Sequence, residues 1–251
     1  MQKEEVLLQK RLIELSRTAF QRGIVTYSDF LNLNELNILH TTPKQDFYTC
    51  YETFGGYEFS ERQMVAFLPD ALCYEKKFPI VPLKIEPLQK KFSEDLSHRD
   101  YLGSILNLGI ERCKIGDILV EDEYAILFAH KSLETFFIKE ISRIKHTSVK
   151  ISSVDIMTWN YEPRTKEITG TVSSIRLDSM LSLAFGSSRS KLVTLIEAGK
   201  VYVNGKLITS NGYQLKEDDI ISVRGLGRFQ YKQVMSQTKK GRYYVTIHLY
   251  I

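Results

Sequence analysis

The segment from residue 173 to residue 206 constrains the fold of this chain more than any other. Apolar residues recur at helical spacing on both sides of Gly186-Ser187, which predicts two short helices that meet at a tight turn. Asn204-Gly205 follows and predicts a β-hairpin with a type I′ turn, because both positions tolerate positive φ. Cations stand at the helix starts and around the hairpin. The pattern therefore predicts a compact helix–helix–hairpin unit that can present its cations together to an anion.

Positive charge is concentrated in the same part of the chain. Residues 171–251 hold twelve Lys and Arg against five Asp and Glu, a net charge of +7. The other residues hold 22 and 25, a net charge of −3, and the two parts sum to the overall +4. A basic end on a slightly acidic body is typical of a protein that binds a polyanion through that end.

The helix–helix–hairpin segment resembles the alpha-L RNA-binding motif, the module named after the ribosomal small-subunit protein S-four. The resemblance makes RNA the expected partner. Ser187 and Ser188 are expected to cap the second helix, whose N-terminal N–H groups suit a phosphate. Asp178 is expected to pair with a nearby cation and orient it. The expected RNA-binding residues are Arg176, Ser187, Ser188, Arg189, Ser190, Lys191, Lys200, Asn204, Lys206, Arg224 and Arg228, the last two on a flexible loop.

The rest of the sequence predicts an α+β chain of three small domains. The first pattern is a helix over 3–21, a second helix capped by Ser28-Asp29, and strands over 47–54 and 63–68. The next elements follow the order β-α-β-β-α-β of ferredoxin-like and RNA-recognition folds. They are strands at 80–85, 116–120, 124–129 and 148–154 and helices at 97–108 and 131–143.

Proline positions and changes in pattern predict the domain boundaries. The expected division is an N-terminal α+β domain (1–78), an RNA-recognition-like βαββαβ domain (79–158), a linker (159–172) and an S-four-type RNA-binding domain with a C-terminal strand extension (173–251). In the middle domain only Tyr124 and Phe128 could stack bases, and the Lys/Arg-Gly-Phe-x-Phe signature is missing. Core packing is therefore the favoured role for both rings.

Several other classes of protein are not expected from this sequence. No apolar run is long enough to span a membrane, and the N-terminus lacks the apolar core of an export signal. Cys50, Cys73 and Cys113 are scattered and odd in number, which fits a reduced cytosol and predicts neither disulfides nor a zinc site. We expect no metal, no cofactor and no small-molecule substrate.

Three motif fragments fail to predict catalysis or nucleotide binding. His98-Arg99-Asp100 lacks the asparagine that a kinase catalytic loop needs, and Ser97 makes it a helix start instead. Arg176-Leu177-Asp178 matches a triplet of pseudouridine synthases, but it lies inside the RNA-binding module itself. Gly225-Leu226-Gly227 lacks the third glycine and the lysine of phosphate-binding loops. No catalytic residue is therefore expected.

Signature segments outside the module make the whole chain similar to the YlmH family of bacterial S-four-type proteins. They are His98-Arg-Asp-Tyr-Leu-Gly103, Leu108-Gly-Ile-Glu-Arg112, Ile115-Gly-Asp-Ile118 and Arg224-Gly-Leu-Gly-Arg-Phe229. The resemblance implies a non-enzymatic, cytoplasmic RNA-binding protein that associates with the large ribosomal subunit in ribosome-associated quality control. It also implies a link to cell division, because members of the family sit among division genes.

The leading hypothesis is a protein that binds structured ribosomal RNA or tRNA on the ribosome and has no enzymatic activity. Two alternatives stay open. One is an RNA-modifying enzyme, of the pseudouridine synthase or methyltransferase type, with a cryptic active site. The other is a scaffold associated with cell division that uses the amphipathic N-terminal helix.

Overall fold

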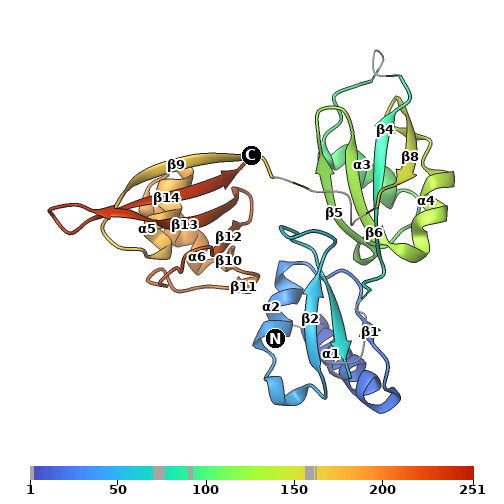
Figure 1. Ribbon diagram of the computed structural model, residues 1–251, viewed down its shortest axis with the longest axis horizontal. Coiled ribbons are helices and arrows are strands. Elements are labelled where there is room, and N and C mark those ends of the chain that lie inside the picture. The colour runs from blue at the N-terminus through green and yellow to red at the C-terminus, as the bar shows by residue number, and fades with distance from the viewer. Residues whose placement is uncertain (1–2, 70–76, 90–92, 156–160, 162) are drawn as a thin grey trace. The chain divides into compact units, whose positions relative to one another are not determined.

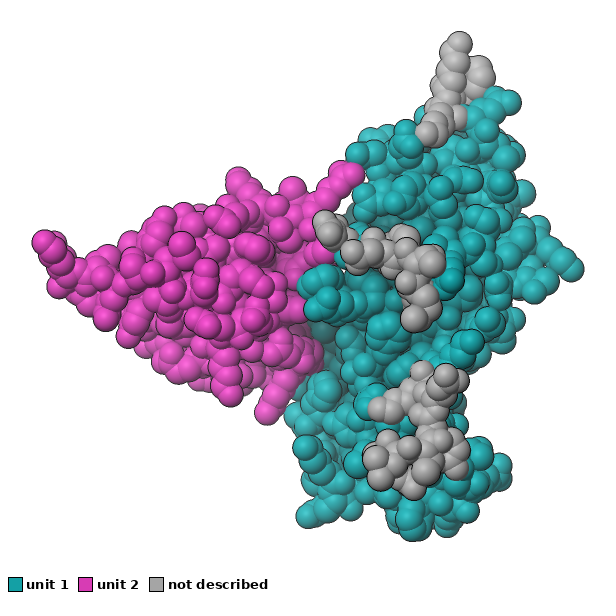
Figure 2. All heavy atoms as spheres, viewed as in Figure 1, with its two compact units in different colours: residues 1–161 teal, residues 162–251 magenta. Residues whose placement is uncertain are grey.

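The computed structural model describes residues 3–69, 77–89, 93–155, 161 and 163–251 of the chain. The chain forms two compact units, residues 1–161 (unit 1) and residues 162–251 (unit 2), which Figure 2 colours separately. Each unit has its own buried apolar core. Within the described residues, no helix combines the length and the apolar character that a bilayer-spanning segment needs.

The first part of unit 1 packs two helices on a small antiparallel sheet (Figure 1). The helix predicted over 3–21 is confirmed, because Leu12 and Ala19 bury its inner face in a cluster with Phe67 of the sheet. The sheet has the order β1-β3-β2. The elements are α1 (Lys3–Arg22), β1 (Thr26–Tyr27), α2 (Leu33–Thr41), a 3₁₀ turn (Lys44–Asp46), β2 (Cys50–Phe54) and β3 (Met64–Leu68).

The cap predicted for the second helix was wrong. The α2 helix begins after Asn32, whose side-chain oxygen accepts from the backbone N–H of Glu35 at 3.1 Å. The Glu35 carboxylate in turn accepts from the Asn32 N–H at 2.7 Å, which completes a capping box. Ser28 lies beside β3 instead, where its hydroxyl accepts from the Val65 N–H at 2.9 Å. The serine therefore accepts a hydrogen bond from a strand and does not cap a helix.

The second part of unit 1 contains the predicted β-α-β-β-α-β order. Its sheet has the strand order β5-β6-β4-β8-β7, and every strand is antiparallel to its neighbours. Buried residues of the two helices pack with the sheet in one apolar cluster. The elements are β4 (Ile80–Pro87), α3 (His98–Leu106), a 3₁₀ turn (Arg112–Lys114), β5 (Ile115–Val120), β6 (Ala125–His130), α4 (Glu134–Glu140), β7 (Arg143–Ile144) and β8 (Thr147–Ser153).

One predicted helix of this part is shorter than expected. The pattern over 131–143 forms a 3₁₀ turn (Lys131–Leu133) and then α4, and Arg143 already belongs to β7. Ile141 ends the helix with an extended backbone, and its N–H donates to Phe137 O at 3.1 Å. The two-residue strand β7 pairs with the start of β8, so local strand pairing ended the helix early.

The His98-Arg99-Asp100 triplet opens a helix, as the capping interpretation predicted. The Asp100 carboxylate accepts from both the N–H and the hydroxyl of Ser97 at the start of α3. It also lies 2.8 Å from the Lys145 ammonium group. The hydrogen bonds from Lys145 and Ser97 lower the pKa of Asp100 to about 2. The carboxylate therefore has a structural role at a helix start.

Asp117 is one of the residues that join the β2–β3 loop to the middle sheet of unit 1. Asp117 on β5 accepts from the Tyr57 hydroxyl at 2.9 Å, from the Glu61 N–H at 2.7 Å and from the Arg62 N–H at 3.1 Å. These three donors belong to the loop between β2 and β3. The loop is therefore held against the middle sheet by bonds to a charged acceptor, which are the stronger class of hydrogen bond.

The same loop covers the middle sheet with an aromatic ring. Phe128 on β6 has no solvent exposure, and Tyr57 stacks on it with ring centroids 4.9 Å apart. The second candidate ring, Tyr124, is half-buried and carries the Lys84 ammonium 4.8 Å from its centroid. Core packing, the favoured role, is confirmed for Phe128, because an RNA base cannot stack on a ring that is already covered.

Two arginines next to this joint are held by backbone carbonyl oxygens. Arg62 donates to the oxygens of Phe30 and Ile115, and Arg112 donates to those of Ile115 and Gly116. Burial and the neighbouring Arg62 charge lower the pKa of Arg112 to about 10. Each guanidinium thus offsets its desolvation with neutral acceptors. Both cations stabilise the joint between the two sheets.

Unit 2 is one six-stranded antiparallel sheet with two helices on one face (Figure 1). Leu177, Leu181, Leu192 and Ile196 of the helices are fully buried in one cluster with residues of the sheet. The strand order is β11-β10-β12-β13-β14-β9. The elements are β9 (Thr165–Val172), α5 (Leu177–Phe185), α6 (Arg189–Glu197), β10 (Val201–Val203), β11 (Lys206–Leu207), β12 (Ile220–Val223), β13 (Gly227–Gln237) and β14 (Tyr243–Tyr250).

The linker predicted over 159–172 is a strand from Thr165 onward. This strand, β9, pairs with β14 along its whole length, from Thr165 opposite Tyr250 to Val172 opposite Tyr243. Its Thr, Lys and Glu side chains are exposed, and these polar residues led the sequence to predict a linker. The start of the predicted linker, residues 159–160, lies outside the described residues. The alternating residues of the C-terminal tail predicted a further strand, and β14 confirms it.

The joint of unit 1 can be tested by Asp117→Ala. The variant leaves the Glu61 and Arg62 N–H groups without their acceptor, so we expect the free energy of unfolding to fall by about 2 kcal/mol. Urea unfolding of the full chain, followed by circular dichroism, measures the change. Asp95→Ala is the matched control, because this exposed carboxylate should alter stability by less than about 0.5 kcal/mol. Equal stability of the two variants would contradict the role given to Asp117.

Candidate nucleic-acid interface

The turn between α5 and α6 has the geometry that the sequence predicted. Gly186 ends α5 in the left-handed region, at φ 59°, and its N–H donates to Ser182 O at 3.1 Å. Ser188 occupies the N-cap position of α6, but its side chain makes no capping bond and lies 3.3 Å from the Ser190 hydroxyl. The side-chain cap predicted from Ser187 and Ser188 is therefore absent, and the first N–H groups of α6 have no capping side chain.

The centre of the candidate interface is an arginine fork, which we define as Arg176, Asp178 and Arg189. Asp178 accepts from Arg176 Nε at 3.3 Å and from Arg176 Nη2 at 3.0 Å. Its other pairing is with Arg189 Nη2, at 2.5 Å. The Asp178 side chain is only 4% exposed, while those of Arg176 and Arg189 are 37% and 50% exposed. The carboxylate is buried beneath two cations that reach solvent.

The charge of Asp178 is maintained by its two partners. Burial alone would raise the pKa of this carboxyl, but the hydrogen bonds from Arg189 and Arg176 outweigh it and lower the pKa below its ordinary value. Asp178 also accepts from the Ser179 N–H at 2.8 Å at the start of α5. One buried charge therefore orients both guanidinium groups, and each keeps N–H donors that do not bind Asp178.

The α6 helix and the β10–β11 hairpin carry the next three predicted residues. Lys191 is exposed in the first turn of α6, and Lys206 is exposed at the start of β11. Asn204 turns the hairpin with positive φ, as predicted. Its side chain, however, donates to Asp219 at 2.8 Å and accepts from the Ile220 N–H at 2.9 Å. The amide of Asn204 is thus occupied in holding the hairpin to β12.

The remaining cations lie where the strands β10, β12 and β13 start or end. The Arg224 N–H donates to Lys200 O at 3.0 Å, so these two residues are neighbours. The Arg224 guanidinium lies 5.7 Å from the Tyr202 ring, and that of Arg228 lies 4.4 Å from the Tyr250 ring. The flexible loop predicted for these arginines was wrong. It is a tight turn closed by Leu226 N–H to Val223 O at 3.1 Å, and Arg228 belongs to β13.

The predicted residues therefore form two groups in unit 2. Lys200, Arg224 and Arg228 lie at the end of the sheet where β14 finishes, because Arg228 is beside Tyr250. Arg176 lies shortly after the last residue of β9, which pairs with Tyr243 at the start of β14. It therefore lies toward the other end of the sheet. The arginine fork belongs to this second group. Sequence spacing could not separate the groups, since it carries no information on which ends of the strands meet.

Cations at the tip of the β13–β14 hairpin were missed by the sequence prediction. Lys239, Lys240 and Arg242 are all exposed there. A signal for them existed, because residues 220–251 contain six Lys and Arg and no Asp or Glu. The alternating apolar residues of this segment drew attention to its strand character instead.

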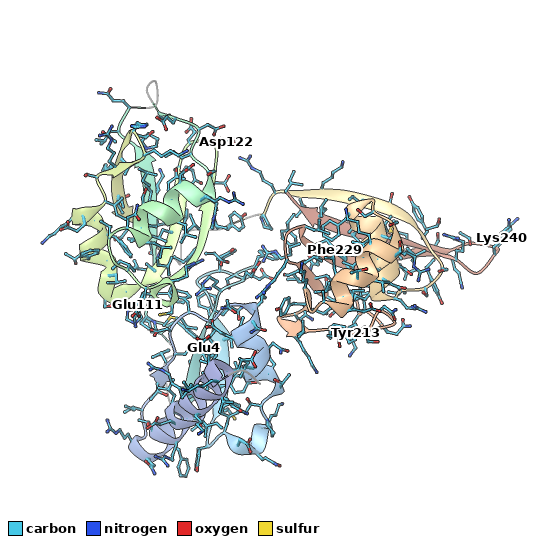
Figure 3. All side chains as sticks on the ribbon, turned by 180° about the vertical axis from the view of Figure 1, so that it is seen from behind. Glu4, Glu111, Asp122, Tyr213, Phe229 and Lys240 are labelled. Carbon is cyan, nitrogen blue, oxygen red and sulfur yellow. The ribbon has the colours of Figure 1, made fainter. Side chains whose placement is uncertain are left out.

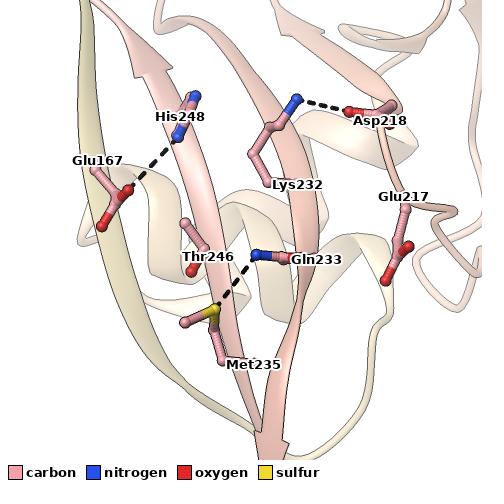
Figure 4. A pocket seen from close by; sticks show the side chains of 8 residues that line it. All are labelled: Glu167, Glu217, Asp218, Lys232, Gln233, Met235, Thr246 and His248. Atoms are coloured by element: carbon pink, nitrogen blue, oxygen red, sulfur yellow. Dashed lines mark hydrogen bonds and ion pairs between the residues drawn. The ribbon is translucent and has the colours of Figure 1, made fainter.

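A pocket on the outer face of the same sheet is a poor site for RNA. His248 and Thr246 of β14 line it (Figure 4), and their chain neighbour Ile247 faces the core under the helices. Two of its carboxylates are paired, Glu167 with His248 at 3.7 Å and Asp218 with Lys232 at 2.7 Å. Glu217 adds a third carboxylate to the lining. These carboxylates would repel phosphate, so this pocket does not support RNA binding on the outer face of the sheet.

The His, Cys, Asp and Glu side chains are scattered over the described part of the chain. Among these residues, no three His, Cys, Asp or Glu side chains are grouped so that they could hold a metal ion. Cys50 is exposed and Cys113 partly buried, both as free thiols, and Cys73 lies outside the described residues.

The fold and the cation groups define the class of the protein, an RNA-binding protein with an S-four-type C-terminal domain. Residues 74–158 match the family described as "Putative RNA-binding domain in YlmH", and residues 175–221 match the family described as "S4 domain". These matches confirm the predicted class.

Two relatives extend the likeness over the whole chain and to the fold. The chain is 28% identical over 247 residues to the ribosome-associated protein quality control protein P2 of Bacillus subtilis (strain 168), with 97% of this chain and 95% of that protein covered. It shares its fold with the cell division protein ylmH from Streptococcus pneumoniae, at a TM-score of 0.51 and 22% identity. That match covers 62% of this chain and 94% of the other. The two family matches and the relative that covers nearly the whole chain together support a YlmH-family RNA-binding protein of the S-four type.

The arginine fork can be tested by Asp178→Asn, which removes the buried charge and keeps the shape. We expect the free energy of unfolding at pH 7 to fall by about 2 kcal/mol, because two guanidinium groups lose their charged acceptor. Since folding lowers the pKa of Asp178, its stabilisation is present above the ordinary carboxyl pKa and is lost as pH falls through the folded value. Urea unfolding at several pH values should show the wild type and the variant converging below about pH 4. A constant difference down to pH 2 would contradict this account.

Proposed function

We propose that the chain is a non-enzymatic, cytoplasmic protein that binds structured RNA on the ribosome through the helix side of unit 2. The observation that carries the proposal is the arginine fork, in which one buried carboxylate orients two half-exposed guanidinium groups. Guanidinium groups bind phosphate oxygens through paired N–H donors, and a fork fixed in advance loses less conformational entropy on binding.

Three further features of the α5–α6 region support phosphate recognition. Lys191 lies exposed in the first turn of α6, where the N–H groups lack a capping side chain. A helix N-terminus carries a partial positive charge that favours an anion. Lys206 adds a further exposed cation on the hairpin that follows. Together these groups suit a folded RNA backbone better than a small ligand.

The ribosome is proposed as the location because of the relative whose name describes ribosome-associated protein quality control. We propose that the chain contacts ribosomal RNA of the large subunit, and tRNA held there, in the same process. Unit 1 would then contribute surfaces other than the ring face of its middle sheet, because Tyr57 covers Phe128.

Charge reversal in α6 tests the proposed site. We expect the double variant Arg189→Glu and Lys191→Glu to abolish co-sedimentation with purified bacterial ribosomes, because it places two negative charges against phosphates. The matched control is Lys216→Glu with Lys232→Glu, which makes the same change in net charge within unit 2. Circular dichroism should show that both variants are folded. Retained ribosome binding by the α6 variant would count against the proposal.

The salt dependence of binding gives a second test. If four or five phosphates are neutralised, the slope of log K against log salt should be about −3 to −4. Raising the salt from 50 to 200 mM should therefore weaken binding to ribosomes on the order of a hundredfold. Sedimentation at several KCl concentrations measures the slope. Affinity that does not respond to salt would rule out a phosphate-dominated contact.

A further inference from the structure

The β13–β14 hairpin extends well past the rest of unit 2 (Figure 1). β13 pairs with β12 from Gly227 to Gln230. Beyond that point β13 pairs only with β14, as far as Gln237. Figure 3 labels Lys240 at the far end of this ribbon. β9 pairs with the other edge of β14 up to Val172, opposite Tyr243. With β9 at its edge the ribbon is three-stranded, whereas a two-stranded hairpin alone is only marginally stable in water.

The tip of the hairpin is fixed by its own hydrogen bonds. Gly241 N–H donates to Thr238 O at 2.8 Å, which makes residues 238–241 a β-turn with Lys239 and Lys240 at its two central positions. Thr238 N–H donates to Arg242 O at 2.7 Å, and the Thr238 hydroxyl accepts from the Arg242 N–H at 3.0 Å. Gly241 has φ 73°, the left-handed conformation that favours glycine. The turn therefore holds two lysines at the far end of a hydrogen-bonded hairpin.

No carboxylate balances this charge. Residues 220–251 contain no Asp or Glu, and within the described part of the chain no ion pair joins Lys239, Lys240 or Arg242 to an acidic side chain. Lys232, which lies in β13 itself, is paired with Asp218 at 2.7 Å. The cations of the tip thus differ from Lys232 nearer the base of the hairpin, whose charge is balanced by Asp218.

The tip and the arginine fork lie toward the same end of the sheet. Arg242 donates to Thr171 O at 2.9 Å, and Tyr243 pairs with Val172. Arg176 follows Val172 by four positions in the chain, so their Cα atoms are at most about 14 Å apart. Paired strands add about 5 Å, which puts the Cα atom of Arg176 within roughly 20 Å of that of Tyr243. One folded RNA could therefore contact both elements.

We propose that the tip of the β13–β14 hairpin is a second RNA site, at which Lys239, Lys240 and Arg242 contact phosphates of a segment next to the one held by the arginine fork. This inference rests on the proposed function, because it adds a contact to the same RNA. The rigid turn adds affinity at little entropic cost, and the spacing of the two sites selects RNA by its shape.

The variant Lys239→Gln with Lys240→Gln tests the tip. Binding to purified bacterial ribosomes is expected to persist, but the slope of log K against log salt should become less steep by about 1.4 to 1.8. Raising the salt from 50 to 200 mM should therefore weaken binding of the variant only roughly tenfold, against about a hundredfold for the wild type. Hydroxyl-radical footprinting should show that one group of ribosomal nucleotides loses its protection while the rest stays protected.

Two matched variants separate a local contact from an effect of net charge. Lys239→Arg with Lys240→Arg keeps the charges and should keep the wild-type slope. Lys216→Gln with Lys232→Gln removes the same charge from the carboxylate-bearing side of unit 2 and should leave the slope unchanged. An unchanged slope for the tip variant overturns the inference, and so does an equal loss in both Gln variants.

The outcomes distinguish this inference from the proposed function. If the tip variant binds normally while Arg189→Glu with Lys191→Glu abolishes binding, the second site is wrong and the proposed function stands. If neither variant affects ribosome binding, both are wrong. Vesicles that contain anionic phospholipid serve as the alternative probe. A tip variant that loses vesicle binding but keeps the ribosome slope would assign the tip to a membrane surface and overturn the inference.

Discussion

The pairing of one buried carboxylate with two guanidinium groups holds the candidate interface together. Asp178 lies at the start of α5, and Arg189 contacts it from the start of α6. The ion pairs therefore connect the two helices and also balance the buried charge. Without the carboxylate the arginines would repel each other where the helix N-termini are already positive. The same contact therefore stabilises the turn and orients two guanidinium groups whose side chains remain partly exposed.

Local patterns predicted the parts of the fold that depend on local chemistry. Gly186 and Asn204 both adopt the left-handed backbone that their turns require, and the predicted helices and hairpin form around them. Features that depend on distant partners were missed. Ser28 bonds to Val65 instead of capping a helix, and Asp117 bonds to a loop more than fifty positions earlier in the chain.

The candidate site follows the same division. The link between Asp178 and its arginines could be predicted because all three lie within one short motif. The use of the Asn204 amide could not, because its partner Asp219 comes from another strand connection. The tyrosine rings beneath Arg224 and Arg228 belong to other strands, so the sequence alone could not place them. The family matches supply the class of partner, and the contacts supply the geometry.

The position of β9 has a practical consequence for any shortened form of this protein. The segment that resembles the RNA-binding motif starts after this strand, and the corresponding family match starts at residue 175. A fragment cut there would strip β14 of its neighbour and leave a row of unpaired N–H and C=O groups along eight residues. Open edges of this kind recruit other chains and aggregate. A soluble fragment should therefore retain Thr165 and the residues that follow it.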